Sequence, residues 1–184
     1  MIHVLGFLFI LILGTLCHFI YEWSKRKKIF AIFCAVNEST WEHLKLVMGP
    51  FFLWMMIEIP FIGDNPNYLF AKAVSLIIMI LFIPLFFYGY QALTKKDIFY
   101  LDILDFIIAI LLGQYASYYM LNIEPVSQLI NIISLITLII ILILYLTKTI
   151  NPSRNFLFRD PITNKYGLDA YIPNRLKLKK KKTV

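Results

Sequence analysis

Five long apolar segments occupy most of this chain and constrain its fold more than any other feature. They cover residues 2–21, 42–62, 69–93, 98–121 and 126–146. A helix needs about 20 such residues to cross roughly 30 Å of hydrocarbon. Because 60% of all residues are hydrophobic and only 16% are charged, a soluble domain is not expected. The sequence predicts an all-α fold, a polytopic membrane helix bundle with about five transmembrane helices.

A shorter apolar piece, residues 29–36, lies between the first two long segments. It is too short to cross a membrane, so it predicts an interfacial or re-entrant helix before the second long helix. Ser39 precedes Glu42 at the spacing of a capping box. In that motif Ser39 accepts a hydrogen bond from the backbone of Glu42, and the Glu42 side chain reaches back to the backbone of Ser39. The second long helix is therefore expected to start here.

Lysines and arginines are distributed unevenly, and this asymmetry predicts the orientation. With the N-terminus outside and the C-terminus cytoplasmic, all but one of the 18 basic residues lie on the cytoplasmic side, the exception being Lys72. The two outer loops, around Asp64 and Glu124, are short and slightly acidic. Membrane topology thus explains the net charge of +7, and no nucleic-acid partner is expected.

The composition changes abruptly from apolar to polar and basic after residue 149. This change divides the chain into a transmembrane helix bundle, residues 1–149, and a basic cytoplasmic tail, residues 150–184. The lysine-rich run at residues 177–182 should attract anionic lipid headgroups, at about 1 kcal/mol per basic residue. Turn-forming residues at Asp160 and Pro161 and at 164–167 predict an ordered hairpin or strap across the cytoplasmic face. Such a strap either lies on the surface or covers the polar residues described next.

Ionisable side chains gather near one end of the long segments. A charged side chain is costly in the hydrocarbon core, so it is found where the protein shields it and where it has a function. Such a cluster therefore marks a candidate site. His18 and Glu22 share one helix face, and Asp102 and Asp105 head a stripe of small residues that should point them into the bundle. The full cluster comprises His18, Glu22, Glu38, Glu42, His43, Asp102 and Asp105.

Three chemical interpretations of this cluster remain open. The first is a ligand site whose polar groups are carboxylates, namely Glu22, Glu38, Glu42, Asp102 and Asp105. The second is a site for one divalent metal ion such as zinc, held by His18, His43, Glu42 and Asp105. The third is structural: Glu22, Glu38 and Glu42 are interfacial and pair with basic residues at 25–28, with Lys45 or with Lys96, while His18 packs against the bundle and donates one hydrogen bond. No residue is assigned a catalytic role.

Two further features lie outside the cluster. Glu58, near the outer end of the second long segment, either snorkels to the interface or pairs with Lys72. Cys17 and Cys34 lie in apolar surroundings without a Cys-x-x-Cys spacing. They are therefore interpreted as packing residues, and neither a disulfide framework nor a thiolate zinc site is expected.

Two segments together resemble a known family. Residues 37–43 read Asn-Glu-Ser-Thr-Trp-Glu-His, and residues 158–167 read Phe-Arg-Asp-Pro-Ile-Thr-Asn-Lys-Tyr-Gly. The pair resembles an uncharacterised family of small bacterial integral membrane proteins, seen mainly in low-GC Gram-positive organisms. The resemblance implies a bacterial cytoplasmic membrane and a functional role for Glu38, Glu42 and His43, but it brings no assigned activity.

Three functional hypotheses follow. The first is a transporter component or accessory subunit that binds a small polar or cationic ligand, or a metal ion, in a cytoplasm-facing pocket. The second is a membrane-embedded metal-dependent hydrolase acting on a lipid or lipid-linked substrate. The third is a non-catalytic scaffold. The expected partners are the lipid bilayer, with anionic headgroups at the tail, and either a second copy of the chain or a membrane partner subunit, because five spans are few for a transporter.

Overall fold

Six α-helices and two short 3₁₀ helices make up the computed structural model, which describes residues 1–171. The long helices are α1 (Ile2–Trp23), α3 (Thr40–Ile62), α4 (Tyr68–Thr94), α5 (Phe99–Leu121) and α6 (Gln128–Thr147), and the short elements are α2 (Lys28–Phe33), η1 (Phe156–Phe158) and η2 (Gly167–Ala170). All five long helices are long and apolar enough to cross a membrane. The predicted all-helical, multi-pass fold is therefore confirmed.

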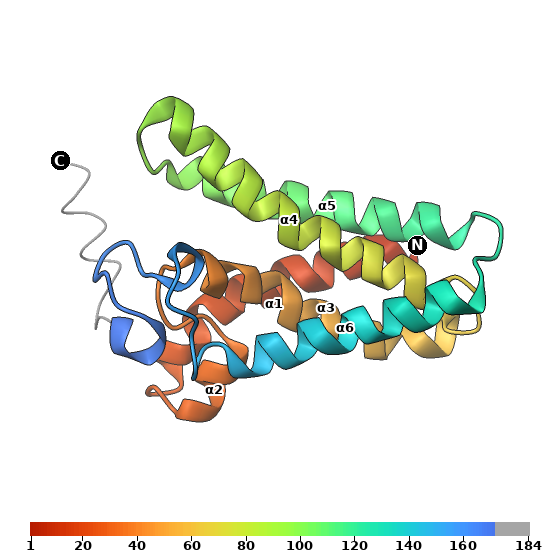
Figure 1. Ribbon diagram of the computed structural model, residues 1–184, viewed down its shortest axis with the longest axis horizontal. Helices are drawn as coiled ribbons and strands as arrows, with labels where there is room; N and C mark the ends of the chain where they lie inside the picture. The colour runs from red at the N-terminus through yellow and green to blue at the C-terminus, as the bar shows by residue number, and fades with distance from the viewer. Residues whose placement is uncertain (172–184) are drawn as a thin grey trace.

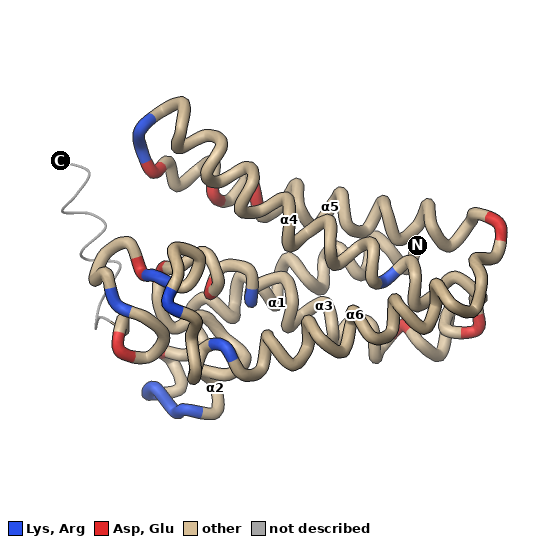
Figure 2. Tube along the Cα trace, in the orientation of Figure 1, with Lys and Arg blue, Asp and Glu red and all other residues tan. Residues whose placement is uncertain are grey.

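The long helices form an elongated bundle in which α4 and α5 run side by side (Figure 1). This pair leans away from α1 and α3 toward the end of the bundle that also carries α2 and η1 (Figure 1). Most lysines and arginines gather there (Figure 2), including those at residues 25–28, 95 and 96. We call this end the basic end and the opposite one the far end. The lysine run at residues 177–182 lies outside the described residues.

Small residues allow the helices to approach closely at two crossings. A Cβ on Gly14 of α1 would overlap the backbone carbonyl oxygen of Leu46 on α3. A Cβ on Gly113 of α5 would overlap the side chain of Met79 on α4, and the Gly113 carbonyl accepts a hydrogen bond of 2.7 Å from Ser75 Oγ. Close packing of this kind is what holds helices together in lipid, where there is no hydrophobic driving force between them.

A buried ion pair lies in the half of the bundle nearer the far end. Lys72 Nζ is 2.5 Å from Glu58 Oε1, and both side chains are fully buried. Lys72 also donates to Ser117 Oγ at 2.9 Å. Of the two alternatives for Glu58, pairing with Lys72 is confirmed and snorkelling is wrong. The reason is that the pair links α3 to α4 inside the bundle, where each charge needs its partner.

The chain between α2 and α3 is buried, although it is not helical. After the short α2, residues 34–39 run through the interior at the basic end. The Ser39 side chain accepts a hydrogen bond from the Glu42 backbone at 3.4 Å, as a capping box requires. The reciprocal half of the predicted box is wrong, because the backbone N–H of Ser39 donates to Asn37 Oδ1 at 2.8 Å.

The segment after α6, residues 148–171, returns across this buried stretch, and we call it the strap. Asp160 Oδ1 accepts hydrogen bonds from the backbone N–H groups of Ile162 and Thr163 at 2.6 and 3.1 Å, which orders a turn. The strap contacts the loop before α3 through Asn37 Nδ2, which donates to the Gly167 carbonyl at 2.9 Å. Gly167 has φ of +51°, a conformation that favours glycine. The predicted ordered strap is thus present.

Candidate functional site

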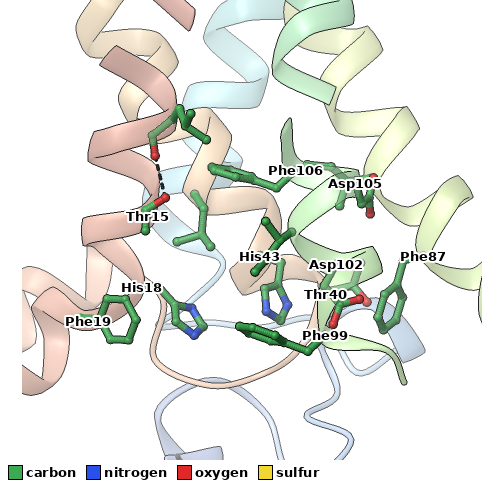
Figure 3. Close-up of a pocket in the computed structure, with 14 residues that line it drawn as sticks. Thr15, His18, Phe19, Thr40, His43, Phe87, Phe99, Asp102, Asp105 and Phe106 are labelled. Atoms are coloured by element: carbon green, nitrogen blue, oxygen red, sulfur yellow. Dashed lines mark hydrogen bonds between the residues drawn. The ribbon is translucent and has the colours of Figure 1, made fainter. Parts of the chain in front are cut away.

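A cavity of about 270 Å³ lies at the basic end, where α4 and α5 diverge from α1 and α3. Its walls are mainly apolar, with polar groups at a few points (Figure 3). The apolar lining comprises Leu11, Phe19, Leu46, Ile83, Phe87, Phe99, Ile103 and Phe106, and the polar lining comprises Thr15, His18, Thr40, His43, Asp102 and Asp105. An apolar hollow with a few convergent polar groups is typical of small-molecule sites.

The carboxylate wall of the cavity comes from α5. Asp105 is only 3% exposed, and its Oδ1 has no hydrogen-bond partner among residues 1–171. Asp102, one turn earlier, accepts a hydrogen bond from the Tyr90 hydroxyl of α4. The small residues Ala109 and Gly113 continue the same face, which is why α5 can turn these aspartates inward.

The imidazole wall comes from α1 and α3. The rings of His18 and His43 stack at 5.9 Å between centroids, and in Figure 3 His43 lies between His18 and the aspartates. Glu38 lies against both rings, with its carboxylate oxygens 4.0 Å from His18 Nε2 and 3.7 Å from His43 Nε2. His43 Nδ1 is 3.2 Å from the Ser39 carbonyl oxygen, which can only accept. His43 Nε2 can therefore donate to Glu38 only when the ring is protonated.

Glu42 belongs to a different buried network, centred on Lys45. Lys45 is fully buried, and its Nζ donates to Glu42 Oε2 at 3.1 Å and to Thr149 Oγ1 at 2.7 Å. It also donates to the carbonyl oxygens of Ala31 and Cys34 at 2.7 and 2.9 Å, so it satisfies the carbonyls that α2 leaves free at its end. This network ties together α2, α3 and the start of the strap.

The sequence analysis named Lys45 as one possible partner of the glutamates but missed its burial. It counted this lysine among the cytoplasmic charges, whereas the side chain lies inside the bundle. The available signal was its position within an apolar helix, three residues after Glu42, where a charge must be buried or paired.

The structure brings together only part of the predicted cluster. His18, His43, Asp102 and Asp105 line one cavity, and Glu38 lies behind the two histidines. The other two glutamates point elsewhere: Glu42 joins the Lys45 network, and Glu22 accepts a hydrogen bond of 3.4 Å from the Tyr171 hydroxyl of the strap.

The metal interpretation requires His18, His43, Glu42 and Asp105 to converge. Among residues 1–171, no group of three or more His, Cys, Asp or Glu side chains is arranged to hold a metal ion. Glu42 instead accepts a hydrogen bond of 3.1 Å from the Lys45 ammonium group.

The two cysteines lie together beside this site. Both Cys17 and Cys34 are buried and carry free thiols. A hydrogen bond with Cys17 and burial raise the pKa of the Cys34 thiol. A raised pKa favours the protonated thiol, which is the less reactive form.

A model of a protein family matches most of the chain. Residues 2–168 match the model of a family of unknown function, DUF6512. The chain belongs to this family. The match covers all five membrane-spanning helices and most of the strap, so cavity and strap both lie within the family region. No curated protein and no solved structure matches the chain significantly.

The site of this DUF6512 member combines an apolar hollow with a carboxylate that lacks a partner. A buried, unpaired carboxylate costs free energy unless a cation or a proton neutralises it. The carboxylate wall can therefore accept the positive group of a ligand, while the aromatic and aliphatic walls accept its apolar part.

Proposed function

We propose that this protein binds a small ligand carrying a cationic group in the cavity between α1, α3, α4 and α5. It does so as a transporter component or accessory subunit of a bacterial cytoplasmic membrane. The basic end faces the cytoplasm and the N-terminus lies outside, because lysines and arginines resist transfer to the outer face. In this orientation the ligand site lies near the inner leaflet.

The proposal rests on one observation, which is the environment of the Asp105 side chain. Its side chain lines the cavity, is almost completely buried and has an oxygen without a partner among the described residues. Two other buried acidic groups in the bundle each pair with a lysine: Glu42 with Lys45, and Glu58 with Lys72. A cationic ligand would give Asp105 the partner that the chain itself does not provide.

The other two hypotheses have less support. A metal-dependent hydrolase needs a set of metal ligands, and the described residues offer none of the required kind. A scaffold would account for the Lys45 network and for the strap, but it does not require a cavity with an unpartnered carboxylate at its wall.

The proposal is tested by ligand-dependent stabilisation of the purified protein in an uncharged detergent. Octylamine, a primary amine, is compared with octanol, its neutral counterpart. A ligand that binds only the folded state stabilises it by about 2.7 kcal/mol at 100 times its Kd. Octylamine should therefore raise the melting temperature, and octanol should raise it much less.

Two variants make the test specific. Asp105→Asn should abolish the amine-dependent shift, whereas Asp64→Asn, an exposed carboxylate at the far end, should retain it. Equal shifts with octylamine and octanol, or an undiminished octylamine shift in Asp105→Asn, would refute the proposed cation site.

A further inference from the structure

The cavity reaches the outer surface of the bundle between α1 and α5. Ile103 and Phe99 of α5 line the cavity, yet they are 43% and 62% exposed. Thr15 of α1 also lines it and is exposed. These residues belong to membrane-spanning helices, so their exposed surface contacts lipid in a bilayer. The cavity therefore has a mouth that faces the acyl chains.

Other sides of the cavity are closed by contacts. Thr40 and Tyr88 share a hydrogen bond of 2.7 Å, which joins α3 to α4. Phe156 of the strap packs edge-on against Tyr88 at 5.7 Å between centroids and extends this closure. Toward the far end, the crossing of α1 and α3 at Gly14, with Phe106 packed against it, seals the floor. These contacts leave open the mouth between α1 and α5, and they also leave uncovered the side at His18 and His43, whose side chains are 23% and 34% exposed.

The volume of the cavity fits only part of a lipid-sized molecule. Its 270 Å³ is close to the lower bound of about 300 Å³ for small-molecule pockets. An amphiphile could place its polar group and first methylenes inside, while the rest of its chain passes through the mouth into the bilayer. Binding of a small water-soluble cation would not require an opening lined by the apolar side chains of Phe99 and Ile103.

We infer that the occupant of the cavity is a lipid-like amphiphile with a primary ammonium group, which enters sideways from the leaflet between α1 and α5. The ammonium group lies at Asp105, with Asp102 one turn away, and the apolar chain leaves past Ile103. This inference rests on the proposed function and adds the class of ligand and its path of entry. The charge complementarity at Asp105 and the apolar mouth are independent observations, and both favour the same occupant.

The experiment compares two neighbouring residues of α5 as sites for a bulky blocker. Ile103 and Leu104 are 43% and 44% exposed, but only Ile103 lines the cavity. Ile103→Trp should narrow the mouth, whereas Leu104→Trp adds the same side chain on the lipid-facing surface beside it. Binding of octylamine and of propylamine, which has the same charge and a much shorter chain, is titrated for the native protein and for both variants.

The expected result is that octylamine binds at least tenfold more tightly than propylamine. Ile103→Trp should weaken octylamine binding at least fivefold, and Leu104→Trp should leave it within twofold. If propylamine binds as tightly as octylamine, or if both tryptophan variants behave alike, lateral entry of an amphiphile is overturned. In that case, binding that still depends on Asp105 would leave the proposed cation site standing, so the two proposals fail separately.

The source of the amphiphile is tested on the same protein by native mass spectrometry. Phosphatidylethanolamine carries a primary ammonium group, and phosphatidylglycerol does not. After delipidation and incubation with an equal mixture, the native protein should retain phosphatidylethanolamine preferentially, and Asp105→Asn should lose this preference. Retention of both lipids in equal amounts would overturn recognition of the ammonium group in a membrane lipid.

Discussion

Trp41 and Phe158 stack with their ring centroids 4.8 Å apart and their planes 29° from parallel. Trp41 is the second residue of α3, and Phe158 ends the short helix η1 of the strap. The contact joins residues 37–43 to residues 158–167, the two motifs that carry the family resemblance and lie far apart in the sequence. The strap is therefore part of the folded core at the basic end, and it positions the loop that carries Glu38 behind the cavity.

Removal of the Phe158 ring should destabilise the basic end. Phe158 is 7% exposed, whereas Phe156, two residues earlier, is 72% exposed. Truncation of a buried phenylalanine to alanine costs about 3–5 kcal/mol. Phe158→Ala should lower the free energy of unfolding in mixed micelles by that order and make the strap accessible to protease. Phe156→Ala is the matched control and should change stability by about 0.5 kcal/mol or less; equal effects would mean that the strap is not anchored through Phe158.

Loss of the Lys45 ammonium group should be among the most damaging single changes. Lys45→Met leaves Glu42 buried without its cation, and breaking a buried pair in this way costs about 3–5 kcal/mol. Adding Glu42→Gln to Lys45→Met should recover part of the loss, because no unpaired charge then remains. The same substitution at the exposed Lys96 should be nearly neutral. A double variant as unstable as Lys45→Met would show that the carbonyl contacts of Lys45, rather than its pairing with Glu42, hold the network.

Two glycines in helices should respond in opposite directions to alanine. A Cβ at Gly14 would overlap the backbone of α3, whereas a Cβ at Gly89 of α4 meets nothing within 4 Å. Overpacking costs about 1–3 kcal/mol, while replacing an exposed helical glycine by alanine gains up to about 1 kcal/mol. Gly14→Ala should therefore lower the melting temperature and Gly89→Ala should raise it. A neutral Gly14→Ala would indicate that α1 and α3 can separate without cost.

Much of the fold could be predicted because its determinants are local. Each spanning helix is an apolar run of the required length, and the predicted ends lie within about two residues of those in the structure. The N-cap at Ser39 is equally local, since it depends on a spacing of three residues. The inward position of Asp105 followed from the small residues that continue its face.

The remaining features depend on partners distant in the sequence. Glu42 has the spacing of a capping box, yet Lys45 and Thr149 together determine where its carboxylate points. No local sequence pattern predicts that Thr149 lies beside the Glu42 carboxylate. For the same reason, the sequence placed Glu22 in the ligand cluster, whereas Tyr171 of the strap binds it. Composition identified which groups are candidates, but tertiary contacts divided them between the cavity, the Lys45 network and a hydrogen bond to the strap.

The orientation can be tested with single introduced cysteines. Glu124 lies exposed at the far end and Lys96 at the basic end, whereas the native Cys17 and Cys34 are buried. If the basic end is cytoplasmic, a membrane-impermeant maleimide should label Glu124→Cys in intact cells and Lys96→Cys only after permeabilisation. The opposite labelling pattern would place the cavity at the outer leaflet.

Replacement of Asp105 should stabilise the ligand-free protein while removing its ligand site. Its buried Oδ1 has no partner among the described residues, and an unsatisfied buried polar group costs about 1–3 kcal/mol, more when charged. Asp105→Leu should therefore raise the melting temperature in the absence of ligand and abolish the shift with octylamine, a trade of function for stability. Asp160 is the matched control, because it is also buried but accepts hydrogen bonds from three backbone N–H groups, those of Glu38, Ile162 and Thr163. Asp160→Leu should destabilise the protein; a comparable loss in Asp105→Leu would show that Asp105 already has a structural partner and would remove the main support for the cation site.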